Sequence, residues 1–256
     1  MDITILGNGG GVNEGLPYNA FLIDDTFLCE TPPDIMLSLS REKCDLRKIK
    51  LVYISHFHAD HYFGFPFVVL NAMVQGHGGF KIIGPKPLKD TLNDITVEAF
   101  GAETPFPGWL REKCTFFEIE DGRTPADRTP PGGSTFDVSV REKLTFYHLE
   151  HFMETYGFLL MKNGAPLFAY LPDTLWCESM KLVLEQCPSF ALVDLNGATA
   201  EANKVHFSEA DLLEYAVPIT GEKTKYLGTH LMRYKKSEID QLEYTVPGMK
   251  VTIPDG

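Results

Sequence analysis

The chain alternates short apolar runs with polar segments, and this alternation predicts its strands. Apolar runs of about four to six residues, bounded by turn-forming residues, are typical of buried strands. Their number is large enough to build more than one sheet. The predicted strands cover residues 3–6, 20–23, 27–30, 51–55, 80–83, 115–119, 136–140, 144–149, 156–161, 167–171, 191–195, 225–228 and 250–253.

Longer segments with a period near 3.6 residues fall between some of these strands and predict helices. Pro33 suits a first helical turn, Ser208 suits an N-cap, and Ser237 suits the cap of a last short helix. Strands interleaved with helices predict an α/β protein built in layers, with helices outside and two sheets inside. The longer predicted helices cover residues 34–40, 62–74, 87–100 and 174–186.

The domain organisation predicted from this pattern is simple. No linker divides the chain, so residues 1–256 are expected to form one domain. Residues 101–134, rich in Pro and Gly, predict a long irregular connection. Such a connection is either a lid over a functional site or a surface insertion, and the sequence leaves both open.

Composition narrows the class of protein. A hydrophobic content of 44% is ordinary for a globular protein, and no uncharged apolar stretch is long enough for a membrane span. Five cysteines without a Cys-x-x-Cys pair, and an N-terminus that resembles a strand more than a signal peptide, predict a cytoplasmic protein. The net charge of -12 argues against binding a long nucleic acid mainly through its phosphates.

One short segment carries the predicted chemistry. His56, His58, Asp60 and His61 fall within six residues, directly after an apolar run. Imidazole nitrogens and carboxylate oxygens are ligands that Zn²⁺ prefers. On an extended strand end, His56 and His58 point to the same side and can bind one ion. After a turn, Asp60 and His61 can face a second ion, so the segment predicts a site for two metals.

The His-x-His-x-Asp-His pattern resembles the defining motif of the metallo-β-lactamase superfamily of hydrolases. That resemblance implies a four-layer αβ/βα sandwich of two mixed β-sheets flanked by helices. It also implies three further ligands downstream: a histidine, an aspartate that bridges both metals, and a final histidine. Asp173, after the apolar run 167–171, matches the bridging aspartate, although locally it could equally be a helix cap. His230, after the run 225–228, matches the final histidine.

The remaining histidine has two candidates, His148 and His151. Three apart on an extended chain, they point to opposite sides, so one of the two is expected to serve. His151 lies shortly before Tyr156-Gly157-Phe158 and matches the superfamily pattern better, whereas His148 could be a core residue. The first metal would then be held by His56, His58 and His151, and the second by Asp60, His61 and His230.

Three features resemble one branch of the superfamily, which contains ribonuclease Z and related phosphodiesterases. The segment Leu6-Gly7-Asn8-Gly9-Gly10-Gly11 resembles its opening glycine loop, and His230 with Arg233-Tyr234 resembles its ending. His206, just before Ser208, resembles a branch histidine that reaches the scissile phosphate. Asp60 and His206 are therefore the candidate catalytic residues. Arg233 and Ser208 are the candidate substrate contacts.

These resemblances predict a dinuclear hydrolase with two divalent ions, Zn²⁺ first, with Mn²⁺ or Fe as alternatives. A metal-bridging hydroxide would attack a small or cyclic phosphodiester. Ribonuclease Z grips tRNA with a basic arm, and no such arm falls between His151 and His230. The alternatives are tRNA 3′-processing, hydrolysis of a lactone, thioester or β-lactam, and iron-dependent oxidoreduction. A metal-retaining binding protein is a further alternative. Dimers are common in this branch, and a homodimer is among the assemblies that the sequence leaves open.

Overall fold

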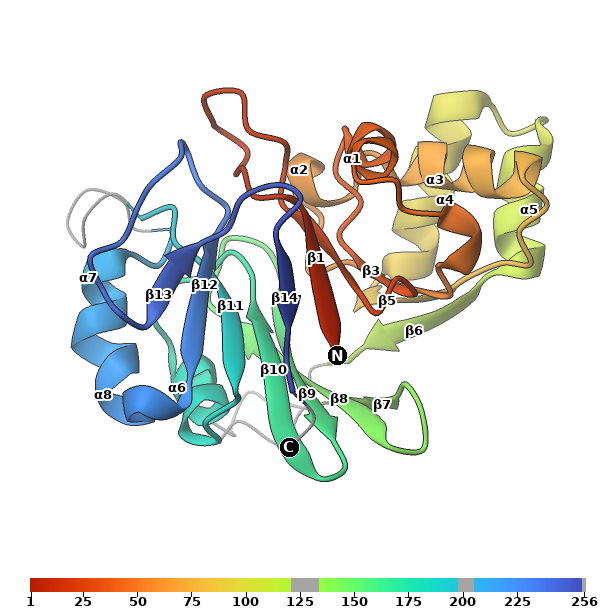
Figure 1. Ribbon diagram of the computed structural model, residues 1–256. Coiled ribbons are helices and arrows are strands. Elements are labelled where there is room, and N and C mark those ends of the chain that lie inside the picture. The colour runs from red at the N-terminus through yellow and green to blue at the C-terminus, as the bar shows by residue number, and fades with distance from the viewer. Residues whose placement is uncertain (121–133, 198–204, 255–256) are drawn as a thin grey trace. The chain divides into compact units, whose positions relative to one another are not determined.

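The computed structural model describes residues 1–120, 134–197 and 205–254 (Figure 1). These residues form two compact units, each built on one seven-stranded sheet. Unit 1 comprises residues 1–11, 15–119 and 246–252, and unit 2 comprises residues 12–14, 120–245 and 253–256. Two mixed sheets with helices confirm the predicted α/β class.

The sheet of unit 1 changes its pairing halfway across. Strands β14, β1, β2 and β3 pair antiparallel, and β3, β4, β5 and β6 pair parallel. The inner strands β2, β3 and β4 are continuous apolar runs because all of their residues are buried, whereas the edge strands β6 and β14 are partly exposed. Their bounds are β1 (Asp2–Gly7), β2 (Ala20–Ile23), β3 (Phe27–Cys29), β4 (Leu51–Tyr53), β5 (Lys81–Pro85), β6 (Thr115–Ile119) and β14 (Lys250–Thr252).

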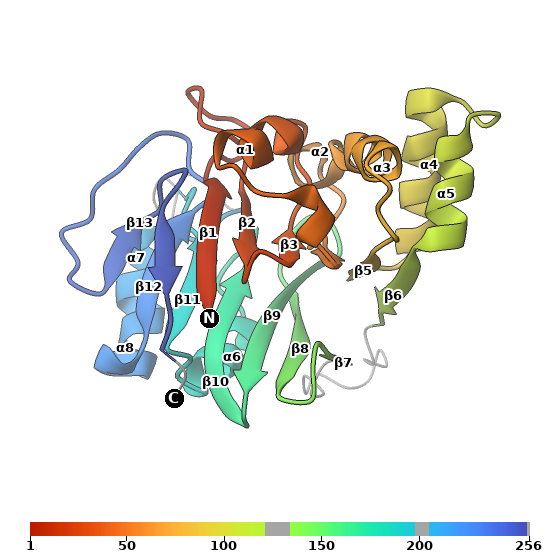
Figure 2. The same cartoon turned by 45° about the vertical axis from the view of Figure 1, so that its right-hand side comes forward.

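The helices of unit 1 pack their apolar sides onto this sheet and onto each other. Helix α3 is buried through Phe65, Val68 and Val69, as expected for a helix that is apolar nearly all round. Helices α4 and α5 lie side by side near β5 and β6 (Figure 2). The bounds are α1 (Ile35–Arg41), η1 (Leu46–Lys48), α2 (Ala59–Tyr62), α3 (Phe65–Val74), α4 (Leu88–Phe100) and α5 (Pro105–Lys113).

The sheet of unit 2 repeats the same change of pairing. Strands β7, β8, β9 and β10 pair antiparallel, and β10, β11, β12 and β13 pair parallel. Its core contains large buried side chains such as Phe158, Phe168 and Tyr170. The strand bounds are β7 (Thr135–Asp137), β8 (Glu142–Leu149), β9 (Thr155–Lys162), β10 (Ala165–Leu171), β11 (Phe190–Asp194), β12 (Lys225–Thr229) and β13 (Leu242–Tyr244).

The helical segments of unit 2 follow its parallel strands. Helix α6 packs against β8 and α8. Ser208 caps α7, as predicted, through a capping box with Asp211. The bounds are α6 (Glu178–Glu185), α7 (Glu209–Asp211), the π-helical η2 (Leu212–Ala216), α8 (Val217–Thr220) and η3 (Gly221–Lys223).

The structure corrects two predicted elements. The predicted helix after Ser237 is wrong, because residues 237–239 have no regular structure, residues 240–241 form a turn, and strand β13 begins at Leu242. The predicted irregular connection over 101–134 is wrong in its first part. Pro105 opens α5 there, in a position where proline needs no backbone donor. Residues 121–133 of that segment lie outside the described residues.

The parallel strands bring the predicted site residues to strand ends. His56 follows β4, Asp173 follows β10, and His230 directly follows β12. The carboxyl ends of neighbouring parallel strands meet at one edge of a sheet, where ligands bind in α/β proteins. Within each unit, the topology therefore gathers side chains that are far apart in the sequence.

Candidate metal centre

In unit 1, the predicted metal-binding motif forms the connection between β4 and α2. His56 and His58 lie in the extended part, and Asp60 and His61 lie in the first turn of α2. His56 and His61 are fully buried. Burying polar rings costs free energy unless they are bonded, and His56 Nδ1 lies 2.9 Å from the Ser55 hydroxyl.

The three imidazoles of the motif crowd together. His56 Nε2 lies 3.0 Å from His58 Nδ1, and the rings of His56 and His61 lie 4.1 Å apart. His61 Nε2 lies 3.6 Å from Asp60 Oδ2. The glycine-rich segment runs beside this cluster, because a Cβ at Gly11 would lie only 3.0 Å from Asp60 Oδ2. The close approach explains why a residue without a side chain occupies that position.

A carboxylate that the sequence did not suggest stands behind the motif. Glu30 follows β3, is fully buried, and places Oε1 3.5 Å from His61 Nδ1. Its other oxygen accepts from Ser55 N at 3.2 Å. A carboxylate on the far nitrogen of a metal-binding histidine fixes its tautomer and orientation. The backbone of Glu30 adopts a φ of 67°, a strained conformation of the kind that concentrates at functional sites.

In unit 2, Asp173 lies at the centre of the predicted ligands. Its Oδ2 lies 3.8 Å from His151 Nε2, and its Oδ1 lies 3.3 Å from His230 Nε2. The two carboxylate oxygens therefore face two different histidines. His230 adopts a φ of 59°, a left-handed conformation that is costly for histidine.

Asp194, at the end of β11, is a second carboxylate that the sequence analysis missed. It accepts a hydrogen bond from His206 Nδ1 at 2.6 Å and lies 3.5 Å from His230 Nδ1. Asp173, Asp194, His206 and His230 place donor atoms within 4.8 Å of one another. A carboxylate at the end of an apolar strand, next in the parallel sheet to the one carrying Asp173, was the available signal.

The electrostatics of Asp194 and His206 are those of an ion pair. Burial alone would raise the pKa of Asp194, but the charge and hydrogen bond of His206 hold that pKa below its usual value. Burial alone would lower the pKa of His206, but Asp194, followed by Asp173, raises it above its usual value. Both directions favour an imidazolium whose Nδ1–H donates to the carboxylate.

The other predicted residues take up different positions. His148 lies within β8 and packs its ring 5.5 Å from that of Tyr156, whereas His151 lies beside Asp173. The Ser208 hydroxyl donates to Asp211 Oδ2 at 2.6 Å within the capping box. Arg233 is largely exposed and lies 3.6 Å from Glu14. Geometry therefore favours His151 over His148 and gives Ser208 a structural role besides its predicted one.

The donor set fits divalent metal ions. Each unit gathers histidines and a carboxylate whose reactive atoms lie close together, with a second carboxylate behind them. Imidazole nitrogen and carboxylate oxygen suit Zn²⁺, Mn²⁺ and Fe alike. Within each unit the donor groups suit a divalent ion, and neither set selects one of these metals.

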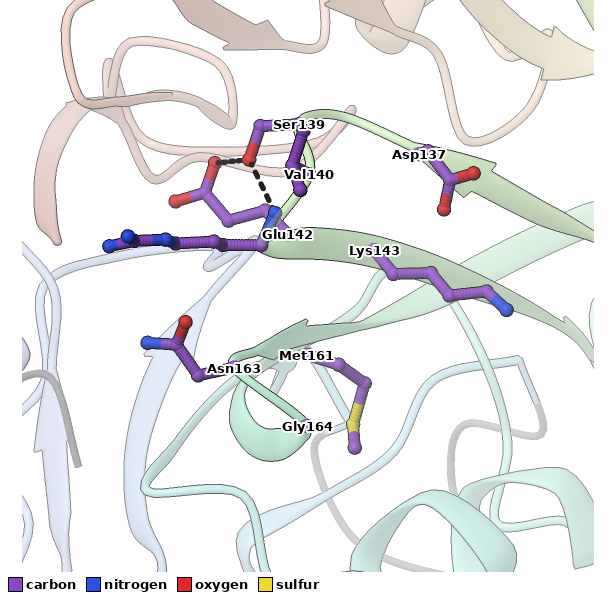
Figure 3. Close-up of a pocket in the computed structure, with 9 residues that line it drawn as sticks. Asp137, Ser139, Val140, Glu142, Lys143, Met161, Asn163 and Gly164 are labelled. Atoms are coloured by element: carbon purple, nitrogen blue, oxygen red, sulfur yellow. Dashed lines mark hydrogen bonds between the residues drawn. The ribbon is translucent and has the colours of Figure 1, made fainter.

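A hollow of about 390 Å³ lies elsewhere in unit 2, between the β7–β8 and β9–β10 turns (Figure 3). Arg141, Lys143, Met161 and Asn163 help to line it, and none of the predicted site residues does. It lies at the opposite end of β8 from His151, about 25 Å away at 3.3 Å per residue. It is therefore separate from the candidate metal centre.

Comparisons with known proteins agree with this fold. Human tRNase Z, short form (ELAC1), superposes with a TM-score of 0.76 at 18% identity, covering 100% of both chains. Unliganded yeast PDE1 superposes with a TM-score of 0.66 at 11% identity, covering 97% of this chain and 98% of that one. A crystal structure described as a metallo-β-lactamase fold protein, YhfI from Bacillus subtilis, superposes with a TM-score of 0.70 at 14% identity, covering 98% of both chains. The fold is metallo-β-lactamase-like, as predicted.

Sequence comparison gives a closer relationship. Ribonuclease BN of Salmonella gallinarum is 25% identical over 120 residues, which are 46% of this chain and 33% of that protein. The chain thus matches about a third of the length of the curated relatives. The sequence model of a family described as Anti-Pycsar protein Apyc1 matches residues 1–243. The chain therefore belongs to the Apyc1 family, and it is a metal-dependent hydrolase of the metallo-β-lactamase fold.

Proposed function

We propose that this protein is a dinuclear metal-dependent phosphodiesterase that hydrolyses a small cyclic phosphodiester, such as a cyclic nucleotide. The seven ligands are His56, His58, Asp60, His61, His151, Asp173 and His230, with Zn²⁺ as the first choice of metal. They act as parts of one hydrolase domain that spans residues 1–256. The cytoplasmic location suggested by the cysteines and the N-terminus is part of the same proposal.

The arrangement around Asp173 carries this proposal. Its two oxygens face His151 and His230, which are assigned to different metals. A carboxylate whose oxygens diverge in this way suits a bridge between two ions. A pair of metals about 3.5–4 Å apart can clamp the attacking and leaving oxygens of a phosphoryl displacement. A site that needed only one metal would have no use for this second set of ligands.

The protein's own residues supply the remaining chemistry. When bound, the two cations would make a nucleophile from water at neutral pH and neutralise the phosphoryl oxygens. Asp194 accepts the Nδ1 proton of His206 at 2.6 Å and so fixes the ring with Nε2 on its opposite side. A proton held at Nε2 can pass to the leaving alkoxide, a contribution of typically 10²–10⁴-fold.

Charge and family membership support a small substrate. A protein with a net charge of -12 repels a long polyanion at a distance, whereas a single phosphodiester experiences mainly the local field of the metals. The matching family is described as an anti-Pycsar protein, and a cyclic nucleotide is the small phosphodiester that we infer from that description. PDE1 also shares the fold.

The test compares hydrolysis of phosphodiester bonds with hydrolysis of other bonds. Purified protein, with each metal added back in turn, should be assayed on bis(p-nitrophenyl) phosphate and on 3′,5′-cyclic nucleotides of several bases. A lactone and a thioester serve as comparison substrates. We expect turnover of the diesters and about two metal ions per chain by elemental analysis. Faster turnover of the lactone or thioester would overturn the proposal.

His206→Ala tests the assigned proton donor. We expect this variant to keep its metal content and to lose phosphodiesterase turnover by about 10²–10⁴-fold, because a general acid contributes that much. Elemental analysis and steady-state kinetics are the two measurements. His77→Ala is the control, since His77 bonds the Ile49 carbonyl at 2.8 Å in unit 1 and belongs to no proposed ligand set. Unchanged turnover in His206→Ala would remove this residue from the mechanism.

Processing of tRNA is the second candidate function. The curated relatives are named ribonuclease BN, and human tRNase Z shares the fold over the whole chain. The same preparation should therefore be given a precursor tRNA. Cleavage of that RNA in preference to cyclic nucleotides would favour this candidate.

A further inference from the structure

One exposed aromatic side chain lies next to a proposed metal ligand. Phe152 is 82% exposed and directly follows His151, and the two rings lie 5.9 Å apart. Single exposed apolar residues are common on protein surfaces, so exposure alone decides nothing. The Phe152 ring is of interest because it lies beside His151, a proposed metal ligand.

The turn that carries Phe152 is held in place. The Glu150 carbonyl accepts from Leu175 N at 2.9 Å and from Thr174 Oγ1 at 3.4 Å. On the other side, Thr155 Oγ1 donates to the Met153 carbonyl at 3.0 Å. The two bonds to Glu150 anchor the β8–β9 turn to the segment that follows Asp173, and the bond to Met153 lies within the turn. The backbone of the turn is therefore held beside the segment after Asp173, and it carries the Phe152 ring 5.9 Å from that of His151.

The chemistry of this ring limits what it can recognise. A phenyl group carries no hydrogen-bonding atom, so it contributes nothing to holding a phosphate or a sugar hydroxyl. It offers a flat apolar face, on which every nucleobase can stack. In a cyclic nucleotide, the base lies one ribose away from the phosphate, so an aromatic ring beside the metal ligands can reach it.

We propose that Phe152 stacks on the base of a cyclic nucleotide whose phosphate is bound at the metal centre. This inference rests on the proposed function and names the substrate contact that the metal ligands cannot supply. Stacking accepts any base, so Phe152 sets a preference for nucleotides over base-free diesters. It does not choose among the bases.

The experiment measures binding without turnover. In a His206→Ala background with metal restored, calorimetry should compare the 3′,5′-cyclic monophosphates of adenosine, guanosine, cytidine and uridine with trimethylene phosphate, which has no base. Phe152→Ala should weaken binding of the cyclic nucleotides by roughly 5- to 150-fold. Binding of trimethylene phosphate should not change, and Phe152→Trp should retain nucleotide binding.

A matched control separates this contact from a general loss of exposed apolar surface. Val140 is fully exposed in the turn between β7 and β8, and Val140→Ala should bind every probe as the parent does. Equal nucleotide binding by Phe152→Ala and its parent would overturn the inference. So would a parent that binds nucleotides no better than trimethylene phosphate.

Two further outcomes distinguish the competing explanations. Light scattering of Phe152→Ala tests whether the ring is covered by a second copy of the chain, and a change from dimer to monomer would overturn the inference. If nucleotide binding depends on Phe152 but the wild-type protein hydrolyses no phosphodiester, the proposed function fails and the stacking contact stands.

Discussion

At the scale of single residues, two buried carboxylates lie against histidines of the candidate site, where they can hold the rings in place. Glu30 lies behind His61 in unit 1, and Asp194 lies behind His206 and His230 in unit 2. The motif residues could be predicted because their spacing is dense and unusual. Glu30 could not, because it lies 26 residues before His56 in the chain, and only the parallel pairing of β3 with β4 brings it near.

Asp194→Asn tests this role. The amide keeps the shape of the side chain, but it is uncharged and only its oxygen accepts hydrogen bonds. It cannot hold both histidines as the carboxylate does, so metal affinity should fall about 10- to 100-fold. Competition with a fluorescent chelator measures that affinity. Asp240→Asn is the control, because Asp240 is exposed and lies in the same unit. An unchanged affinity in Asp194→Asn would show that its carboxylate does not orient the ligands.

At the scale of elements, the strands were predicted more completely than the helices. All thirteen predicted strands correspond to strands in the structure, most of which are apolar runs of buried residues. Strand β13 was missed because it has three residues, of which Glu243 is exposed. Tertiary contacts define β13: Tyr244 donates to Glu209 Oε2 at 2.5 Å and packs over Gly228. No local pattern contains that information.

Gly228→Ala tests the packing of β12 against β13. A Cβ at this position would lie 2.6 Å from the Tyr244 ring, so the ring or the strand must move. Overpacking of this kind costs about 1–3 kcal/mol of unfolding free energy, which urea denaturation measures.

Gly108→Ala is the matched control for that variant. It lies in α5 with open space around its Cβ, and alanine there should stabilise by about 0.5–1 kcal/mol. If both variants unfolded at the same urea concentration, the contact between Gly228 and Tyr244 would not limit this part of the sheet.

At the scale of the whole molecule, the fold class and the ligand types followed from the sequence, and the supporting residues did not. The motif implied the superfamily, and the superfamily implied two mixed sheets, which the structure contains. Across the described residues, no helix has the length and apolar character to cross a bilayer. The loop predicted over 101–134 contains α5. The prediction failed there because Pro105, which suggested a turn, lies in the first turn of that helix.

If both units contribute ligands to the same ions, chelation should loosen both units together. Ligand binding stabilises by about 2.7 kcal/mol when the free metal is at 100 times its dissociation constant. Removing metal from the wild type or from His148→Ala should therefore lower the melting temperature and speed amide exchange near β4 and near β12. His151→Ala should respond much less. Faster exchange in only one unit would contradict a shared site.

The left-handed backbone at His230 has a consequence for how this chain can change. Left-handed geometry at a non-glycine residue costs on the order of 1–3 kcal/mol, and glycine would remove that cost. If selection acted only on folding, glycine would therefore replace histidine at position 230. Histidine at this position lowers the stability of the fold, so only selection for function keeps it. Replacement of His230 by glycine in a related chain would therefore be an earlier sign of lost catalysis than a change in the core.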